Sequence, residues 1–166
     1  MLCIKSTRLR KKGFPMNQAC MPPRNDLELQ AALQRQFDGI MSGDPRRIMY
    51  MLAPKLISVN YAGRESCVDY KMEPWMLNAV GILHGGVLST MLDSTMGNFS
   101  RAFSAKSILT LNLQLSFSAP ISPSEEWVHT QCRITSITNR FTHLIATAWA
   151  ESGDTAATAT GIFYLK

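Results

Sequence analysis

The stretch LNAVGILHGGVLSTMLDSTMGNFS, residues 77–100, decides the fold. From His84 onward its apolar residues recur at the spacing of an α-helix and form one broad stripe: Val87, Leu88, Met91, Leu92, Thr95, Met96 and Phe99. The other face has small residues where an exposed helix would have Lys and Glu: Gly86, Ser89, Thr90, Ser94, Gly97 and Ser100. We therefore predict a central helix that a sheet wraps, with its small-residue face packed closely against another surface.

Asp93 is the one charged residue of this stretch, in the middle of the predicted helix. Aspartate is a poor residue in a helix interior, and the positions three and four away offer no cation to pair with it. Two interpretations follow. Asp93 is either a structural carboxylate held by hydroxyls or a distant arginine, or a general base or nucleophile whose surroundings tune its pKa.

The segment GILHGG, residues 81–86, leads into the helix with three glycines, which permit close approach of a ligand to the backbone. Unpaired N–H groups at a helix N-terminus favour developing negative charge, so Gly85 or Gly86 could supply an oxyanion donor. The spacing of the glycines differs from the GxGxxG and GxxxxGK[ST] patterns of nucleotide-binding loops.

Both sides of the helix have the period of two that is typical of strands. LISVNY and CVDYKME flank AGRE, which predicts a hairpin, and alternating runs near 126–137, 141–151 and 155–165 are separated by turns. The run ILTLNLQLSFS predicts a strand whose core face comprises Leu109, Leu111, Leu113, Leu115 and Phe117, with Thr110 on the polar face. The order of hairpin, helix and four strands predicts an α+β fold with antiparallel neighbours.

The residues before the hairpin predict two helices. Leu29, Leu33, Phe37 and Ile40 give residues 26–42 an amphipathic pattern, and GDPRRIMYML predicts a second helix with Asp44 as N-cap and Pro45 at the first helical position. We expect three parts: a basic, disordered tail and linker at 1–25, N-terminal helices at 26–54 and the main domain at 55–166.

Positive charge is concentrated at the N-terminus. Five of the 17 basic residues lie within residues 1–15, which leaves 12 basic residues against 12 acidic ones in the remainder. The basic segment is a disordered tail, a stretch upstream of a start at Met16, or a targeting signal, and we favour the first two. A net-neutral remainder argues against a nucleic-acid partner.

Several classes of protein are disfavoured by composition. No run approaches the roughly 18 apolar residues of a membrane span, so we expect no membrane association. The four cysteines form no CxxC pair and no secretory signal is present, which favours a cytoplasmic location with reduced thiols. The cysteines and the three histidines have no metal-ligand spacing, so we expect no metal site.

Asn78, HGG at 84–86, Asp93 and then FSAP at 117–120 together resemble the hotdog-fold acyl-CoA thioesterases of the phenylacetic-acid-degradation type, over about residues 50–166. The resemblance implies an antiparallel sheet wrapped around the helix, and hydrolysis of an acyl-CoA or aryl-CoA to free acid and CoA. It implies no cofactor beyond the CoA of the substrate. It also favours the catalytic interpretation of Asp93.

The resemblance further implies roles by position. The Gly85 N–H would polarise the thioester carbonyl, and Asp93 would activate water or attack as a nucleophile. Asn78 would position substrate or water, His84 would orient the loop or contact the thioester, and a hydroxyl at Thr110 would lie near the water. Gly86 joins Asn78 among the implied substrate-binding positions.

Helix geometry predicts that the site is shared between chains. Eight residues separate Gly85 from Asp93, which is ~12 Å along the axis and about 80° around it. One carbonyl cannot easily touch both on a straight helix, whereas antiparallel central helices of a homodimer or homotetramer would bring the Gly85 of one chain beside the Asp93 of the other.

Two alternatives stay open. A hotdog dehydratase or hydratase is disfavoured because the helix lacks the Asp-then-His order of the hydratase type. A non-catalytic acyl-CoA sensor could use its basic N-terminus to contact DNA. Residues 26–53, however, contain only Arg35, Arg46 and Arg47 as cations, few for a phosphate-binding surface.

Overall fold

The structure, a computed structural model, describes residues 21–166. The basic segment at 1–15 and the start at Met16 lie outside the described residues. The elements in chain order are α1 (Asp26–Met41), α2 (Ile48–Leu52), β1 (Lys55–Asn60), β2 (Glu65–Lys71), the 3₁₀ helix η1 (Pro74–Met76), α3 (Gly85–Ser104), β3 (Ile108–Phe117), β4 (Trp127–Ile137), β5 (Phe141–Ala150) and β6 (Thr155–Leu165).

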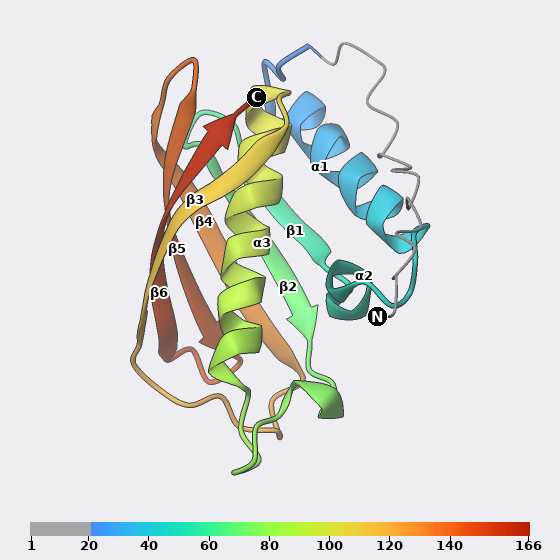
Figure 1. The fold of residues 1–166 in the computed structure, drawn as a ribbon, viewed down its shortest axis with the longest axis vertical. Coiled ribbons are helices and arrows are strands. Elements are labelled where there is room, and N and C mark those ends of the chain that lie inside the picture. The colour runs from blue at the N-terminus through green and yellow to red at the C-terminus, as the bar shows by residue number, and fades with distance from the viewer. Residues whose placement is uncertain (1–20) are drawn as a thin grey trace, which may run out of the picture.

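The described strands form one six-stranded sheet in the order β1-β2-β4-β5-β6-β3, and every pairing is antiparallel. The sheet curves around α3, while α1 lies beside α3 and packs against α3 and β1 (Figure 1). The predicted α+β architecture, with a sheet wrapped around a long central helix, is therefore confirmed. None of the helices within residues 21–166 is both long enough and apolar enough to span a membrane.

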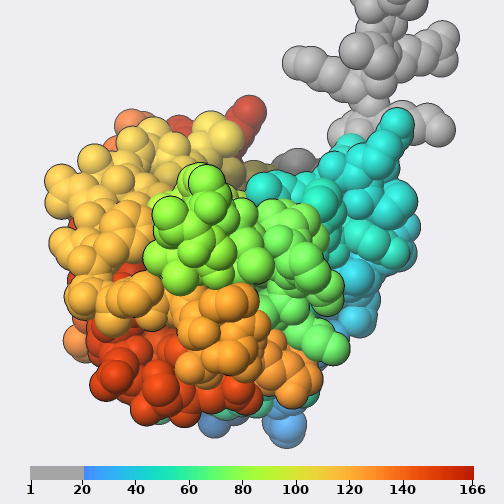
Figure 2. All heavy atoms as spheres, turned by 90° about the horizontal axis from the view of Figure 1, so that it is seen from below, coloured from blue at the N-terminus to red at the C-terminus, as the bar shows by residue number. Residues whose placement is uncertain are grey.

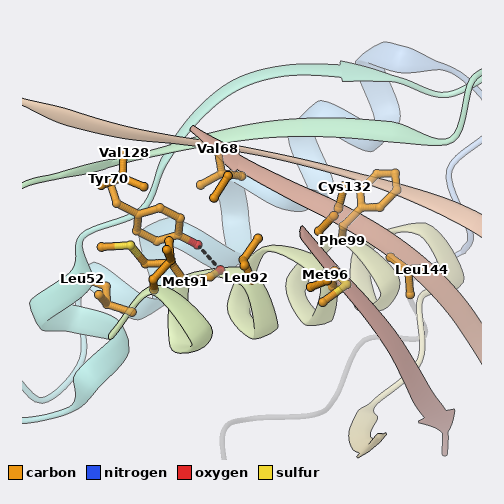
Figure 3. Packing of buried hydrophobic residues seen from close by; sticks show 14 of the residues in the cluster. Leu52, Val68, Tyr70, Met91, Leu92, Met96, Phe99, Val128, Cys132 and Leu144 are labelled. Atoms are coloured by element: carbon orange, nitrogen blue, oxygen red, sulfur yellow. Dashed lines mark hydrogen bonds between the residues drawn. The ribbon is translucent and has the colours of Figure 1, made fainter. Parts of the chain in front are cut away.

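The apolar stripe of α3 faces the sheet, as its spacing predicts. Its members from Leu88 to Phe99 are buried, and Figure 3 shows Met91, Leu92, Met96 and Phe99 packed against residues of the strands. Tyr70 of β2 donates a hydrogen bond from its hydroxyl to the Met91 carbonyl (3.2 Å), and its hydroxyl also pairs with Thr95 Oγ1 (2.9 Å). The buried hydroxyls are thus satisfied inside the core, which is the condition for placing them there.

The small residues of α3 meet their close neighbours within the chain. A Cβ atom at Gly97 would lie 3.3 Å from the Phe163 ring of β6. Ser100 bonds to Thr142 of β5, and Ser94 donates to the Met49 sulfur of α2 (2.8 Å). The predicted enclosure is correct, but these residues do not form one separate face, because the sheet and α2 surround the helix from two sides.

The start of α2 differs from the prediction. Residues 44–47 form a turn, in which the Asp44 carboxylate accepts hydrogen bonds from the backbone N–H and the guanidinium of Arg46. The helix begins at Ile48 and its C-cap Ala53 has a left-handed conformation. The assignment of Asp44 as N-cap and Pro45 as first helical residue was wrong, since the aspartate stabilises the turn itself.

The facing of β3 also differs from the prediction. The pairing of β3 with β6 is shifted between Thr110 and Asn112, so Leu111 is an extra residue in a β-bulge. A bulge reverses the alternation, and as a result Leu113 and Leu115 pack on the core whereas Leu109 and Leu111 are each 58% exposed. The prediction that all five apolar residues share the core face was wrong; Phe117, at the strand end, is also exposed.

We expect Gly161→Ala in β6 to destabilise the protein. A Cβ atom there would lie 2.8 Å from the buried Phe163 ring and 3.2 Å from Met96 of α3, so the ring or the helix must shift. Overpacking of this kind typically costs about 1–3 kcal/mol, and a chain of this length would lose about 3–10 °C in Tm. Thermal unfolding measures the effect, with the exposed neighbour Thr160→Ala as control. An unchanged Tm would show that the helix has room to move away from the sheet.

Candidate active site

The loop before α3 is shaped by Asn78. Its side-chain oxygen accepts hydrogen bonds from the backbone N–H groups of Val80 (3.0 Å) and Ile82 (3.3 Å), and Gly81 completes the turn with a positive φ of 81°. Backbone bonds from Leu83 to Ile121 and from His84 to Met76 fasten the end of the loop to the body of the fold. Figure 2 shows this loop (green) on the surface, between the N-terminal helical part (cyan) and β3 with the loop that follows it.

His84 is the N-cap of α3. Its Nδ1 atom accepts a hydrogen bond from the Gly86 N–H at 2.8 Å. The imidazole is exposed at the start of the helix. No acceptor within residues 21–166 takes the Gly85 N–H. Because the Gly86 N–H is already bonded to His84, the Gly85 N–H is the one of the two predicted donors that remains open to a ligand.

Asp93 lies half-buried in the middle of α3, where the Thr110 hydroxyl of β3 donates a hydrogen bond to Oδ1 at 2.9 Å. Burial raises the pKa of Asp93 above its usual range, and the hydrogen bond from Thr110 opposes this rise. A raised pKa makes the carboxylate a stronger base, provided that it is ionised at the working pH.

Thr110 reaches Asp93 because of the β-bulge. It pairs with the buried Phe163 of β6, so its side chain points toward α3 rather than to the outer face that the strand pattern predicted. After the bulge at Leu111, the side chains of Leu113 and Leu115 face the core. The bulge therefore lets one strand supply a hydroxyl beside Asp93 and apolar packing farther along.

A cavity of about 370 Å³ lies between α3 and the beginning of β3. It is lined by Asp93, Ser94, Gly97, Asn98, Arg101, Ser107, Ile108 and Thr110. Asn98 and Arg101 were not among the predicted site residues. Helical spacing could have indicated Arg101, since Gly97 and Arg101 follow Asp93 at intervals of four residues along one face of α3. No pattern in the sequence marks Asn98.

The predicted site residues form two groups within one chain. Asn78, His84, Gly85 and Gly86 gather at the start of α3, whereas Asp93 and Thr110 meet two turns farther along. The helix is continuous from Gly85 to Ser104, so the separation of ~12 Å between Gly85 and Asp93 along its axis applies.

The other histidines lie away from both groups. His129 of β4 pairs through Nδ1 with the Asp69 carboxylate of β2 at 2.8 Å and stacks on Trp149 of β5, and His143 is an exposed residue of β5. Within residues 21–166, no group of three or more His, Cys, Asp or Glu side chains could hold a metal ion.

We expect Thr110→Val to move the acidic limb of the pH–rate profile to higher pH. The threonine hydroxyl stabilises the ionised form of Asp93, so its removal raises the pKa of the carboxyl further and a higher pH is needed to ionise it. Profiles of kcat/KM against pH measure the shift, and the exposed Ser116→Ala in the same strand is the control. A limb that stays in place would mean that Asp93 does not set it.

Comparison with known proteins concerns the family and the fold. The family model described as the thioesterase superfamily matches residues 80–157, which include the start of α3, Asp93 and Thr110. No curated protein matches the chain.

Solved structures show the same fold. A phenylacetic acid degradation-related protein of Ralstonia eutropha JMP134 superposes with a TM-score of 0.69 at 24% identity and covers 81% of this chain and 99% of its own. The E. coli PaaI protein of the phenylacetic acid degradation operon gives 0.71 at 14% identity, covering 83% and 96%. A Streptococcus mutans UA159 protein bound to acetyl-CoA gives 0.62 at 17% identity, covering 68% and 88%.

At these identities the superpositions demonstrate the fold, and the family model shows a resemblance to the thioesterase superfamily over residues 80–157. The chain thus has the hotdog fold, and its resemblance to the thioesterase superfamily, which the motif from Asn78 to Asp93 predicted, is confirmed.

Proposed function

We propose that the protein hydrolyses an acyl-CoA or aryl-CoA thioester to a free carboxylic acid and CoA. The observation that supports this best is the half-buried Asp93 carboxylate, bonded to Thr110 and open to a cavity. A structural carboxylate could have the same hydroxyl partner. It would not need an adjoining cavity, and the thioesterase-superfamily match covers this segment.

In the proposed reaction, Asp93 removes a proton from water as the water oxygen forms a bond to the thioester carbon. The carbonyl electron pair moves to oxygen, where the Gly85 N–H stabilises the charge. The intermediate then collapses with cleavage of the C–S bond, and the CoA thiolate takes the proton from Asp93. Oxyanion donors and general bases contribute about 10²- to 10³-fold and about 10²- to 10⁴-fold respectively.

A second route uses Asp93 as the nucleophile. Its carboxylate would displace CoA to form an anhydride with the acyl group, and water would then hydrolyse this anhydride. Both routes use water as the co-reactant and leave every oxidation state unchanged, so we propose that no metal or cofactor is required.

The remaining residues of the proposed site act through position. Asn78 holds the loop that presents the Gly85 N–H, and its amide faces the substrate or water in the proposal. His84 fixes Gly86 and can contact the thioester from the helix start. Thr110 orients the Asp93 carboxylate and the attacking water.

We also propose that two chains share each site in a homodimer, alone or within a homotetramer. The two groups of site residues are too far apart on one helix to act on one carbonyl, and antiparallel central helices would bring them together. The exposed strand edge of β3 supports this proposal, because Leu109 and Leu111 lie there in the open. Among the described residues, Cys67 and Cys132 are free thiols, which fits a cytoplasmic location.

The test is a panel of acyl-CoA and aryl-CoA substrates monitored for release of free thiol. We expect release with at least one class of acyl group, and its loss in Asp93→Asn. Tight binding of CoA thioesters without thiol release would favour a non-catalytic sensor instead. Hydration of an enoyl-CoA, measured as loss of its ultraviolet absorbance, would favour the hydratase alternative.

A further inference from the structure

We infer that the cavity beside Asp93 selects acyl groups that end in a carboxylate, and that Arg101 binds this carboxylate. This inference rests on the proposed function, because it assumes that the thioester carbonyl reacts next to Asp93. It adds a substrate class, the CoA monothioesters of short dicarboxylic acids, and a residue that determines specificity.

The lining of the cavity is the first argument. Of the described residues that line it, Ile108 alone has a large apolar side chain, whereas Ser94, Asn98, Ser107 and Thr110 contribute hydroxyl or amide groups. Sites for small molecules are usually lined mainly by apolar and aromatic side chains. Ser94, Asn98 and Thr110 each donate a hydrogen bond within the chain, and the Asn98 amide keeps a second N–H that it can donate to a carboxylate on the acyl group.

The placement of charge is the second argument. Asp93 and Arg101 are the two charged residues among those that line the cavity, and they are eight residues apart on α3, ~12 Å along its axis. Gly97, which also lines the cavity, lies midway between them along the helix. A carboxylate on the acyl group is repelled by Asp93 and attracted by Arg101, so the charges orient the acyl group with its thioester toward Asp93.

Arg101 is suited to this role by its chemistry. It is half-buried, where a charge pair is screened less than on the open surface, and its guanidinium has five N–H donors in a planar fork that matches a carboxylate. Arg101 also has an interaction within the protein. The volume of about 370 Å³ lies near the lower end of the ~300–1,000 Å³ that is typical of ligand sites, so the acyl group is short.

The test compares two substrates of equal carbon number, glutaryl-CoA and valeryl-CoA. The wild-type protein should have the higher kcat/KM for glutaryl-CoA. Arg101→Gln should lower kcat/KM for glutaryl-CoA by about 10- to 100-fold and leave that for valeryl-CoA nearly unchanged, because only the first substrate loses a charge-assisted hydrogen bond. Arg101→Lys should restore part of the preference. Arg133→Gln, on an exposed arginine of β4, is the matched control.

Three outcomes overturn the inference. The wild-type protein could prefer valeryl-CoA, or Arg101→Gln could lower kcat/KM equally for both substrates. Arg133→Gln could also lower kcat/KM for glutaryl-CoA as much as Arg101→Gln does. The wild-type ratio needs no variant and decides the question even if Arg101→Gln unfolds.

Calorimetric binding separates this inference from the proposed function. If no thioester is hydrolysed, the proposed hydrolysis fails. Tighter binding of glutaryl-CoA than of valeryl-CoA, abolished in Arg101→Gln, would still support the carboxylate site, and equal binding of the two would overturn it.

Discussion

Asp93→Asn is expected to lower kcat by at least about 10²-fold while the fold is retained, since the change removes the base and nearly preserves the volume. The asparagine oxygen can still accept the hydrogen bond from Thr110, so the local packing has no reason to change. Thiol release with the best acyl-CoA of the panel measures kcat. Circular dichroism and thermal unfolding report on the fold.

The stability of this variant has a defined sign. Burial raises the pKa of Asp93 in the folded state. Between the unfolded and folded pKa values, the folded state therefore binds more protons than the unfolded state. The free energy of unfolding falls as the pH rises through this window. Above this window the ionised, half-buried carboxylate costs stability. Asp93→Asn should therefore have a Tm no lower than that of the wild type at neutral pH, and any advantage should shrink as the pH is lowered through the window.

Asp69→Asn is the matched control. Asp69 is also a partly buried aspartate, with its side chain 15% exposed, but it pairs with His129 away from the cavity. We expect this variant to keep nearly normal turnover even if its Tm falls. Near-normal turnover in a folded Asp93→Asn protein would return Asp93 to the structural interpretation, with Thr110 as its hydroxyl partner.

Mixing inactive Asp93→Asn chains with chains impaired in the loop, such as Asn78→Ala, is expected to restore activity if the site is shared. Asp93→Asn chains keep an intact loop, and Asn78→Ala chains keep an intact carboxylate, while losing the side-chain oxygen that holds the backbone of Val80 and Ile82. In the heterodimer, one of the two sites receives both intact halves. Random exchange of equal amounts makes half of the dimers mixed, so about a quarter of the wild-type activity should return.

Subunit exchange must be verified independently, for example by mass spectrometry of chains with different tags. The matched control mixes Asp93→Asn with Asp93→Ala chains, which both lack the carboxylate, so no site in any dimer is complete and exchange alone should restore no activity. Exchange without recovery in the first mixture, or full activity in a protein shown to be monomeric, would rule out the shared site.

Much of the fold could be predicted because its pattern is local. The apolar spacing from Leu88 to Phe99 predicts α3, and the alternation in β2 places Val68 and Tyr70 inward, where both are fully buried. The predicted runs near 126–137, 141–151 and 155–165 match β4, β5 and β6 within a residue. Each of these elements buries one face, so apolar residues recur along it with the period of a helix or a strand. This period can be seen within a short segment of sequence.

The errors occurred where a single residue has a role that the local pattern does not distinguish. Asp44 has the composition of an N-cap, but its carboxylate binds the Arg46 backbone within a turn. In β3, perfect alternation gives no sign of an extra residue, because the bulge at Leu111 exists in the pairing with β6 and not in β3 alone.

By itself, the sequence determined the order of elements, the enclosed helix and the lone acid within it, because periodicity and composition depend on neighbours along the chain. The motif of Asn78, HGG and Asp93 also indicated the resemblance to the thioesterase superfamily. Only the tertiary structure decided that Thr110 faces Asp93 and that Arg101 lines the same cavity. These relations depend on the register between α3, β3 and β6, which the packing of distant segments sets and no local pattern encodes.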